Sequence, residues 1–137
     1  MMNTNVVSVS PDESASLAAR LLERHNIGSL PVCGSDGLLK GIVTDRDIVL
    51  RCVAADGDPG RTRVGDIMSG GVVSVAPGDD VTEAARLMAN EQVRRLPVLD
   101  GGRVVGMLSL CDMARRDGFD MEAGRALSEI SENVRRM

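Results

Sequence analysis

Two short motifs in the sequence have the residue types needed to bind a ligand: Thr44-x-x-Asp47 and Ser109-x-x-Asp112. In each, a hydroxyl residue ends an apolar run and an aspartate stands three residues further on. A carboxylate can accept hydrogen bonds from both hydroxyls of a cis-diol, and the start of a helix attracts phosphate. The same spacing also fits an ordinary capping box, which only closes the first turn of a helix. Both roles stay open, and one helix start can combine them.

The two motifs belong to an internal repeat. VVSVSP at residues 6–11 recurs as VVSVAP at 72–77, and the register continues through AARL and LPV. One residue is missing from the next turn of the second copy, after which Asp47 matches Asp112. A repeat of this kind indicates one supersecondary unit used twice.

Each copy predicts the order strand, helix, strand, strand, helix. VVSV is a short β-branched strand, and apolar residues at helical spacing predict helices over 15–25 and 81–91. The runs IGSLPV with LLKGIV, and VRRLPV with RVVGML, predict two hairpins around turns rich in Gly and Asp, with the prolines at strand ends or edges. Further helices are expected after Thr44 and Ser109.

The starts of the first helices carry capping signals. Asp80 with Glu83 predicts a capping box in the second copy. In the first copy Ser10 with Glu13 would serve, but the repeat register favours Ser14, the partner of Asp80. We therefore expect Ser14 to be the N-cap.

The stretch between the copies, AADGDPGRTR, is typical of a linker. We divide the chain into a first motif at 1–54, a linker at 55–63, a second motif at 64–117 and a helical extension at 118–137. A copy of about 60 residues cannot easily bury both faces of its sheet alone. The expected fold class is therefore α/β (α+β), with two β-α-β-β-α motifs packed as a pseudo-twofold module.

Composition excludes several classes of function. The 137 residues carry a net charge of -4 and contain no Trp or Tyr and one Phe, so no aromatic platform for bases exists and nucleic acid is not an expected partner. Three cysteines without CxxC spacing suggest neither a disulfide framework nor a thiolate metal site. His25, the only histidine, excludes a multi-histidine metal site and a His-based triad.

No apolar run approaches the membrane-spanning length of about 18 residues, and no signal peptide is evident, so we expect a cytoplasmic protein without a membrane partner. The carboxylates form no evident catalytic pair. Cys111 at a helix start could be a reactive thiol, but packing is the favoured interpretation. We therefore expect no catalytic residues, no metal and no enzyme activity.

The duplicated pattern of VVSV, LPV, a turn and Gly-apolar-apolar-Thr/Ser-x-x-Asp resembles a tandem pair of cystathionine β-synthase (CBS) domains over about residues 1–117. The sequence DIM at 66–68 is similar to the usual lead-in of such a motif. The first copy begins MMNTN and has no counterpart of this lead-in, so we expect a shortened first motif.

The resemblance implies a regulatory module that binds AMP, ADP or ATP in the cleft between the motifs and requires no cofactor. It assigns the ribose hydroxyls to Asp47 and Asp112. It places Thr44 and Ser109 beside them, in contact with ribose or phosphate. CBS pairs also commonly form homodimers, and a regulated protein would have to be a separate chain.

The phosphate contacts implied by the resemblance differ between the copies. Arg94 and Arg95 precede LPV in the second copy, where the first has Gly28 and Ser29. Basic residues at these positions reach phosphates in the family, whereas in an arbitrary strand they would mark a solvent-facing edge. Strand alternation prevents both from pointing the same way. Arg46 is a weaker candidate, equally compatible with a solvent-facing helix residue.

The last residues and the ligand leave alternatives open. Apolar residues at three-four spacing predict an amphipathic helix that packs on its own module, forms a dimer contact or meets a regulated protein; they are Leu127, Ile130, Val134 and Met137. The alternative functions are a ligand-independent homodimeric scaffold and a CBS pair that binds S-adenosylmethionine or NAD. Arg94 and Arg95 favour a phosphorylated adenosine.

Overall fold

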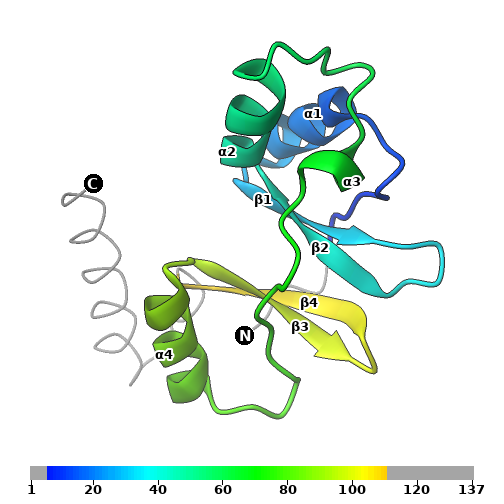
Figure 1. Cartoon of the computed structure of the whole chain (residues 1–137). Coiled ribbons are helices and arrows are strands. Elements are labelled where there is room, and N and C mark those ends of the chain that lie inside the picture. The colour runs from blue at the N-terminus through cyan, green and yellow to red at the C-terminus, as the bar shows by residue number, and fades with distance from the viewer. Residues whose placement is uncertain (1–5, 111–137) are drawn as a thin grey trace. The chain divides into compact units, whose positions relative to one another are not determined.

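The computed structural model describes residues 6–110, which form two compact units (Figure 1). We call residues 7–72 the N-terminal unit and the described residues from 73 to 110 the C-terminal unit. Each unit combines helix with a small antiparallel sheet, so the expected α+β class is confirmed. The predicted C-terminal helix lies outside the described residues.

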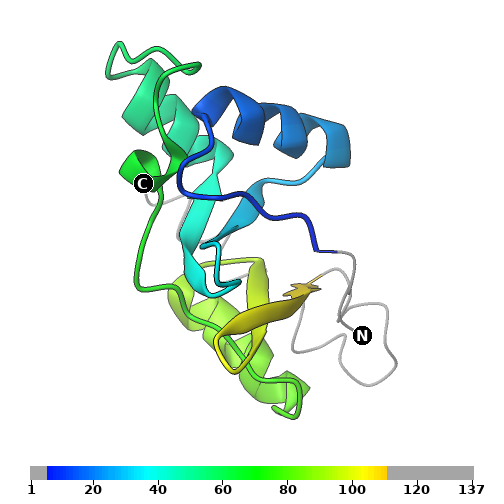
Figure 2. The same cartoon turned by 90° about the vertical axis from the view of Figure 1, so that its right-hand side faces the viewer.

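The N-terminal unit holds six elements. They are α1 (Ala15–His25), β1 (Ser29–Cys33), β2 (Leu39–Thr44), α2 (Asp45–Ile48), the π-helix η1 (Val49–Val53) and α3 (Val64–Ile67). β1 and β2 form an antiparallel hairpin, and α1 and α2 pack against it (Figures 1 and 2).

The C-terminal unit repeats the first part of this order. It contains α4 (Val81–Glu91), β3 (Arg95–Asp100) and β4 (Arg103–Ser109), and Leu110 is again helical. β3 and β4 form the second antiparallel hairpin, against which α4 packs (Figure 1). The helices predicted over 15–25 and 81–91 are confirmed at both ends.

The start of α1 is capped as the repeat register predicts. The Ser14 hydroxyl accepts from the Leu17 N–H at 3.1 Å, which confirms Ser14 as N-cap. The Ala15 N–H donates to Thr62 O at 2.8 Å and the Ser16 N–H to Pro59 O at 3.0 Å. The stretch predicted as a linker therefore satisfies N–H groups that a helix cannot satisfy internally.

The start of α4 differs from its predicted capping box. Asp80 is the N-cap, but its carboxylate accepts from the Thr82 N–H at 2.9 Å. Glu83 instead accepts from Arg86 at 2.8 Å on the exposed face. An i,i+3 ion pair competes for the side chain that the box would use.

The two hairpins share their irregularities. The register shifts between Val32 and Cys33 in one and between Val98 and Leu99 in the other. Each turn ends on a left-handed glycine with φ 82°, at Gly37 and at Gly102. A side chain would be strained at both positions, so these glycines fix where each hairpin turns.

The predicted VVSV strands are wrong in extent: each is reduced to a single parallel bridge, Val9 to Val32 and Val75 to Val98. The Val9 N–H donates to Pro31 O at 3.1 Å and Val9 O accepts from Cys33 N–H at 2.8 Å. A longer strand would need one more hydrogen bond on each side of Val9. On the N-terminal side the donor would be the backbone N–H of residue 31, and on the C-terminal side it would be the N–H of residue 11, but both residues are prolines. Proline has no N–H, so the ladder stops after one residue.

Pro31 lies in the middle of β1 rather than at a strand end, with β2 on one side and Val9 on the other. It lies opposite Ile42 in the hairpin, but Ile42 exchanges both of its backbone hydrogen bonds with Ser69, at 2.9 and 2.8 Å. The missing N–H of Pro31 therefore removes no bond between β1 and β2.

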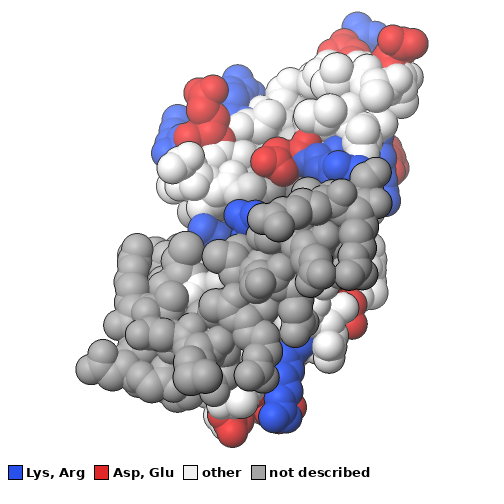
Figure 3. Space-filling model, turned by 90° about the vertical axis from the view of Figure 1, so that its left-hand side faces the viewer, with Lys and Arg blue, Asp and Glu red and all other residues white. Residues whose placement is uncertain are grey.

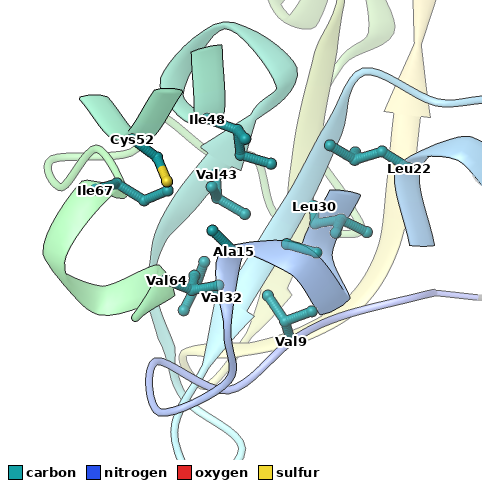
Figure 4. Packing of buried hydrophobic residues seen from close by; sticks show 11 residues of the cluster. Val9, Ala15, Leu22, Leu30, Val32, Val43, Ile48, Cys52, Val64 and Ile67 are labelled. Atoms are coloured by element: carbon teal, nitrogen blue, oxygen red, sulfur yellow. The ribbon is translucent and has the colours of Figure 1, made fainter. Parts of the chain in front are cut away.

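Aliphatic side chains and one cysteine fill the core of the N-terminal unit (Figure 4). Val64 and Ile67 of α3 belong to it and are 0% and 3% exposed. The Val64 N–H donates to Glu13 O at 2.8 Å, and Gly65 to Pro11 O at 2.9 Å. Although the sequence repeat starts its second motif at residue 64, these residues complete the core of the N-terminal unit.

The C-terminal unit has its own core. Its buried members come from α4, both strands and the residue after β4: Ala84, Ala85, Met88, Ala89, Leu96, Val98, Leu108 and Leu110. The described part of the chain is thus held by two aliphatic cores without aromatic residues. Each core positions one Thr/Ser residue at the end of its hairpin.

Candidate functional site

Thr44 and Asp47 form a complete capping box at the start of α2. The Thr44 hydroxyl accepts from the Asp47 N–H at 3.0 Å, and Asp47 Oδ2 accepts from the Thr44 N–H at 2.9 Å. These reciprocal bonds fix both side chains at the point where β2 becomes a helix. The structural role considered from the sequence is therefore present in this unit.

The box uses one of the two carboxylate oxygens of Asp47. The other, Oδ1, lies 4.0 Å from Nε of Arg51, and the Asp47 side chain is 11% exposed. An ionised carboxylate has about four lone-pair positions, so the cap leaves acceptor capacity on Asp47. The arrangement gives a fixed carboxylate with a cation beside it.

Arg51 links this carboxylate to the chain that leaves α3. Its Nη1 donates to Ile67 O at 3.1 Å and to Met68 O at 3.3 Å. Ile67 is the last residue of α3 and Met68 is its C-cap. A helix leaves the carbonyls at its C-terminal end without internal partners, and Arg51 supplies a donor for these two. Sequence reasoning missed Arg51, because its partners are 16 and 17 residues away.

Gly28 and Ser29 lie next to Thr44 at the end of the first hairpin. Ser29 is the register partner of Thr44, and the Asp45 N–H donates to Gly28 O at 3.1 Å. A Cβ on Gly28 would lie 3.6 Å from Oδ2 of Asp45. A carboxylate thus occupies the space beside Gly28.

The C-terminal unit repeats this backbone arrangement with different side chains. Arg95 is the register partner of Ser109, and the Leu110 N–H donates to Arg94 O at 3.0 Å. Arg94 is exposed, Arg95 is half-buried and Ser109 is buried, at 8% exposure. Two guanidinium groups therefore stand where the N-terminal unit has a glycine and a serine.

The structure brings the sequence-predicted residues together in two sets, one in each unit. Thr44 and Asp47 form one set, and Arg94, Arg95 and Ser109 form the other. Arg46 is exposed in the first turn of α2, next to this set. Asp112 lies outside the described residues.

Asp45 was not singled out as a site residue. Its carboxylate accepts from the Arg46 N–H at 2.8 Å and faces Gly28. The signal was available in the repeat register, which aligns Asp45 with Leu110 and Gly28 with Arg94.

The described surface mixes charges of both signs. Figure 3 shows acidic and basic side chains next to one another on the visible described face. Among residues 6–110 no group of three or more His, Cys, Asp or Glu could hold a metal ion. Within the same range no helix has the length and apolarity needed to cross a membrane.

Comparison with known proteins identifies the repeat. The family model described as CBS domain matches residues 1–53 and again 64–117. CBS domain-containing protein YhcV of Bacillus subtilis is 43% identical over 130 residues, which cover 95% of this chain and 91% of that protein. Hypoxic response protein 1 of Mycobacterium tuberculosis is 37% identical over 115 residues, covering 84% and 80%.

Solved structures agree with the sequence relatives. The crystal structure of Hypoxic Response Protein I with two coordinated zinc ions has a TM-score of 0.78 at 37% identity, over 84% of this chain and 93% of that one. The CBS domain pair of protein MJ0100, in complex with 5-methylthioadenosine and S-adenosyl-L-methionine, has a TM-score of 0.73 at 28% identity, over 83% and 89%.

Proteins built from a CBS pair are typically regulatory ligand-binding modules, and stand-alone ones are generally regulatory rather than catalytic. The duplicated hairpins, the two Thr/Ser helix starts and both matches to the family model agree. This chain therefore belongs to the CBS domain family and carries two copies of the domain.

Proposed function

We propose that this chain is a sensor of adenine nucleotides, namely AMP, ADP or ATP. The observation that carries the proposal is the pairing of Arg95 with Ser109 at the hairpin end where Leu110 enters a helix. A guanidinium, a hydroxyl and a helix start suit a phosphorylated ligand, because all three interact favourably with phosphate oxygens.

The ribose is assigned to the aspartates of the two motifs. In the N-terminal unit, Asp47 is held by its capping box with Oδ1 still available as an acceptor near Arg51. A carboxylate fixed before the ligand arrives loses little conformational entropy on binding a diol. By the repeat, Asp112 takes the same role in the second motif.

Related proteins support an adenosine-containing ligand. The MJ0100 domain pair is described in complex with 5-methylthioadenosine and S-adenosyl-L-methionine, which both contain adenosine. The paired arginines of this chain favour a negatively charged 5′ group over a sulfonium. We therefore propose nucleotides first and S-adenosylmethionine or NAD as the alternative ligands.

The regulatory output is part of the proposal. A bound nucleotide can change the chain only if it binds two conformations with different affinity. We propose a cytoplasmic homodimer whose ligand-dependent conformation is recognised by a separate target protein. Light scattering with and without AMP tests the dimer, and a monomer under both conditions would contradict it.

Titration calorimetry of the purified chain with AMP, ADP, ATP, S-adenosylmethionine and NAD tests the ligand. A nucleotide at 100 times its dissociation constant also raises the free energy of unfolding by about 2.7 kcal/mol. Asp47→Asn keeps an amide oxygen for capping and removes the charge. By the repeat, Asp112→Asn is its counterpart, and each substitution should weaken binding at its own site by about tenfold. The exposed Asp66→Asn is the matched control.

One observation favours a second candidate, a scaffold that binds no ligand. The capping box accounts for Thr44 and for one oxygen of Asp47 without any ligand. If no adenosine compound produces heat or thermal stabilisation, the box is only a cap and the scaffold is the better description.

A further inference from the structure

We infer that Asp45 makes the two copies select ligands of different charge, so that the N-terminal unit disfavours a 5′-phosphate that the C-terminal unit accepts. The inference rests on the proposed function. It assigns a specificity-determining role to the first variable residue of the Thr-x-x-Asp motif.

The backbone around both positions is the same. The Asp45 N–H donates to Gly28 O at 3.1 Å, and the Leu110 N–H donates to Arg94 O at 3.0 Å. Ser29 pairs with Thr44 as Arg95 pairs with Ser109. A ligand group placed against one hairpin end therefore has an equivalent place at the other.

The side chains at these equivalent places have opposite charge. In the N-terminal unit the Asp45 carboxylate lies beside Gly28, 3.6 Å from the position of a Cβ on that residue. Its Oδ1 accepts from the Arg46 N–H at 2.8 Å, which holds the carboxylate in place. In the C-terminal unit, the same places carry Leu110 and Arg94.

Charge then decides which adenosine ligand each unit takes. A phosphate next to Asp45 would meet a like charge, whereas one at the equivalent place in the C-terminal unit would lie beside Arg94, which has the opposite charge. For exposed charges about 7 Å apart, screened by water to an effective dielectric of about 35–80, one like-charge pair changes affinity about threefold to tenfold. The N-terminal unit therefore suits an adenosine without negative charge at its 5′ end.

Arg46 is the charged neighbour that could reverse this preference. It follows Asp45 and is exposed, and it is the basic residue of α2. Asp45 is exposed as well, but the bond from the Arg46 N–H fixes its carboxylate beside Gly28, so this charge stays close to the place of the phosphate. We therefore expect Arg46→Ala to leave AMP affinity within about twofold.

Calorimetry of the full chain with AMP and with adenosine tests the inference. AMP should bind one site strongly and the other more weakly. The two sites should differ less in their affinity for adenosine, which has no phosphate. Asp45→Asn, which keeps the acceptor for the Arg46 N–H, should strengthen only the weaker AMP site, by about threefold to tenfold, and should leave adenosine unchanged. Asp45→Glu keeps the charge and should behave as the unchanged chain.

Two further measurements separate charge from structure. Arg94→Ala should weaken only the strong AMP site, and the effect of Asp45→Asn should shrink when salt is raised to about 1 M, where the Debye length is about 3 Å. Two equal AMP sites, or equal effects of Asp45→Asn on AMP and adenosine, would overturn the inference and leave the proposed function intact. Binding of neither compound would overturn both.

Discussion

The two units have the same arrangement of one helix on one hairpin, but they differ in an added helix and in the side chains at the hairpin end. Both have a helix packed on a hairpin, a register shift at the same place and a single bridge to VVSV. The N-terminal unit also takes in α3, which follows its repeat in sequence, and places a carboxylate beside Gly28. The C-terminal unit has Arg94 and Arg95 at the matching strand end.

This difference separates the residues that specify the fold from those that can specify the ligand. The turn glycines, the strand prolines and the helix N-caps recur in both copies and fix the backbone. The side chains at Gly28 and Asp45 are replaced in the second copy without changing the backbone bond between these positions. The ligand charge that each unit prefers can therefore differ while the backbone fold stays the same.

The largest effect is expected on the stability of the N-terminal unit when a core residue of α3 is removed. Ile67→Ala removes a side chain that is 3% exposed in the core of the N-terminal unit. Deletions of this kind cost about 2–5 kcal/mol. Hydrogen exchange should show faster opening of β1 and β2 than in the unchanged chain, with a smaller change in β3 and β4. The exposed neighbour Asp66→Ala should alter neither hairpin.

If Ile67→Ala loosened β3 and β4 more than β1 and β2, α3 would belong functionally with the second motif. The division of the molecule into two separate cores would then be wrong. The same outcome would remove the structural difference from which the comparison starts.

A smaller effect is expected at Gly41, where the chain that follows α3 crosses β2. A Cβ on Gly41 would lie 2.7 Å from Ser69 O and 2.8 Å from Sδ of Met68. Because one of these atoms is backbone, Gly41→Ala should destabilise the fold by about 1–3 kcal/mol in denaturant unfolding. Gly70→Ala is the matched control, since no atom lies within 4 Å of its Cβ position. Equal stability of both variants would contradict this packing.

The helix caps provide the third comparison. Asp47 is buried in a reciprocal box, whereas Asp80 makes one exposed bond to the Thr82 N–H. Asp47→Ala should cost about 1–2 kcal/mol and Asp80→Ala about 0.5–1 kcal/mol. Asp47→Asn should recover most of the loss, because its amide oxygen can accept from Thr44. Equal costs at Asp47 and Asp80 would show that the box adds nothing to the cap.

The smallest effect concerns Cys33, which lies at the register shift where the second hairpin has Leu99. Burial raises the pKa of its thiol, a hydrogen bond with Ser8 lowers it and the charge of Asp36 raises it again, with a net upward shift. Alkylation followed by mass spectrometry should thus be slower at Cys33 than at an exposed thiol at pH 8.

The same shift has a sign for stability. The folded chain holds the thiol proton of Cys33 more tightly than the unfolded chain. The free energy of unfolding therefore falls as pH rises from the ordinary thiol pKa of the unfolded chain toward the higher pKa of the folded chain. Fast labelling of Cys33 near neutral pH would contradict the burial that causes the shift.

The helices and hairpins could be predicted because their signals are local. Ser14 and Asp80 mark the helix starts, and the turn glycines separate the strands. The extent of VVSV was overestimated, since its β-branched residues predict a strand while Pro31 limits the pairing. The proline effect depends on which residue faces which, and a sequence does not show that directly.

The site was only partly predictable for the same reason. Thr44 and Asp47 are three residues apart, so their box follows from the sequence. Arg51 reaches carbonyls of Ile67 and Met68, and such tertiary contacts have no local signal. The repeat already aligns Asp45 with Leu110. Only the structure shows that both residues bond through the backbone to the start of their hairpin, at Gly28 and at Arg94.

A crystal structure of the chain grown with AMP would test the central claim most directly. The account predicts ribose hydroxyls on the aspartate of a Thr/Ser-x-x-Asp motif and a phosphate within hydrogen-bond distance of Arg94 or Arg95, with no phosphate beside Gly28 and Asp45. A phosphate bound beside Asp45, or Asp47 and Asp112 both without nucleotide at saturating AMP, would contradict it.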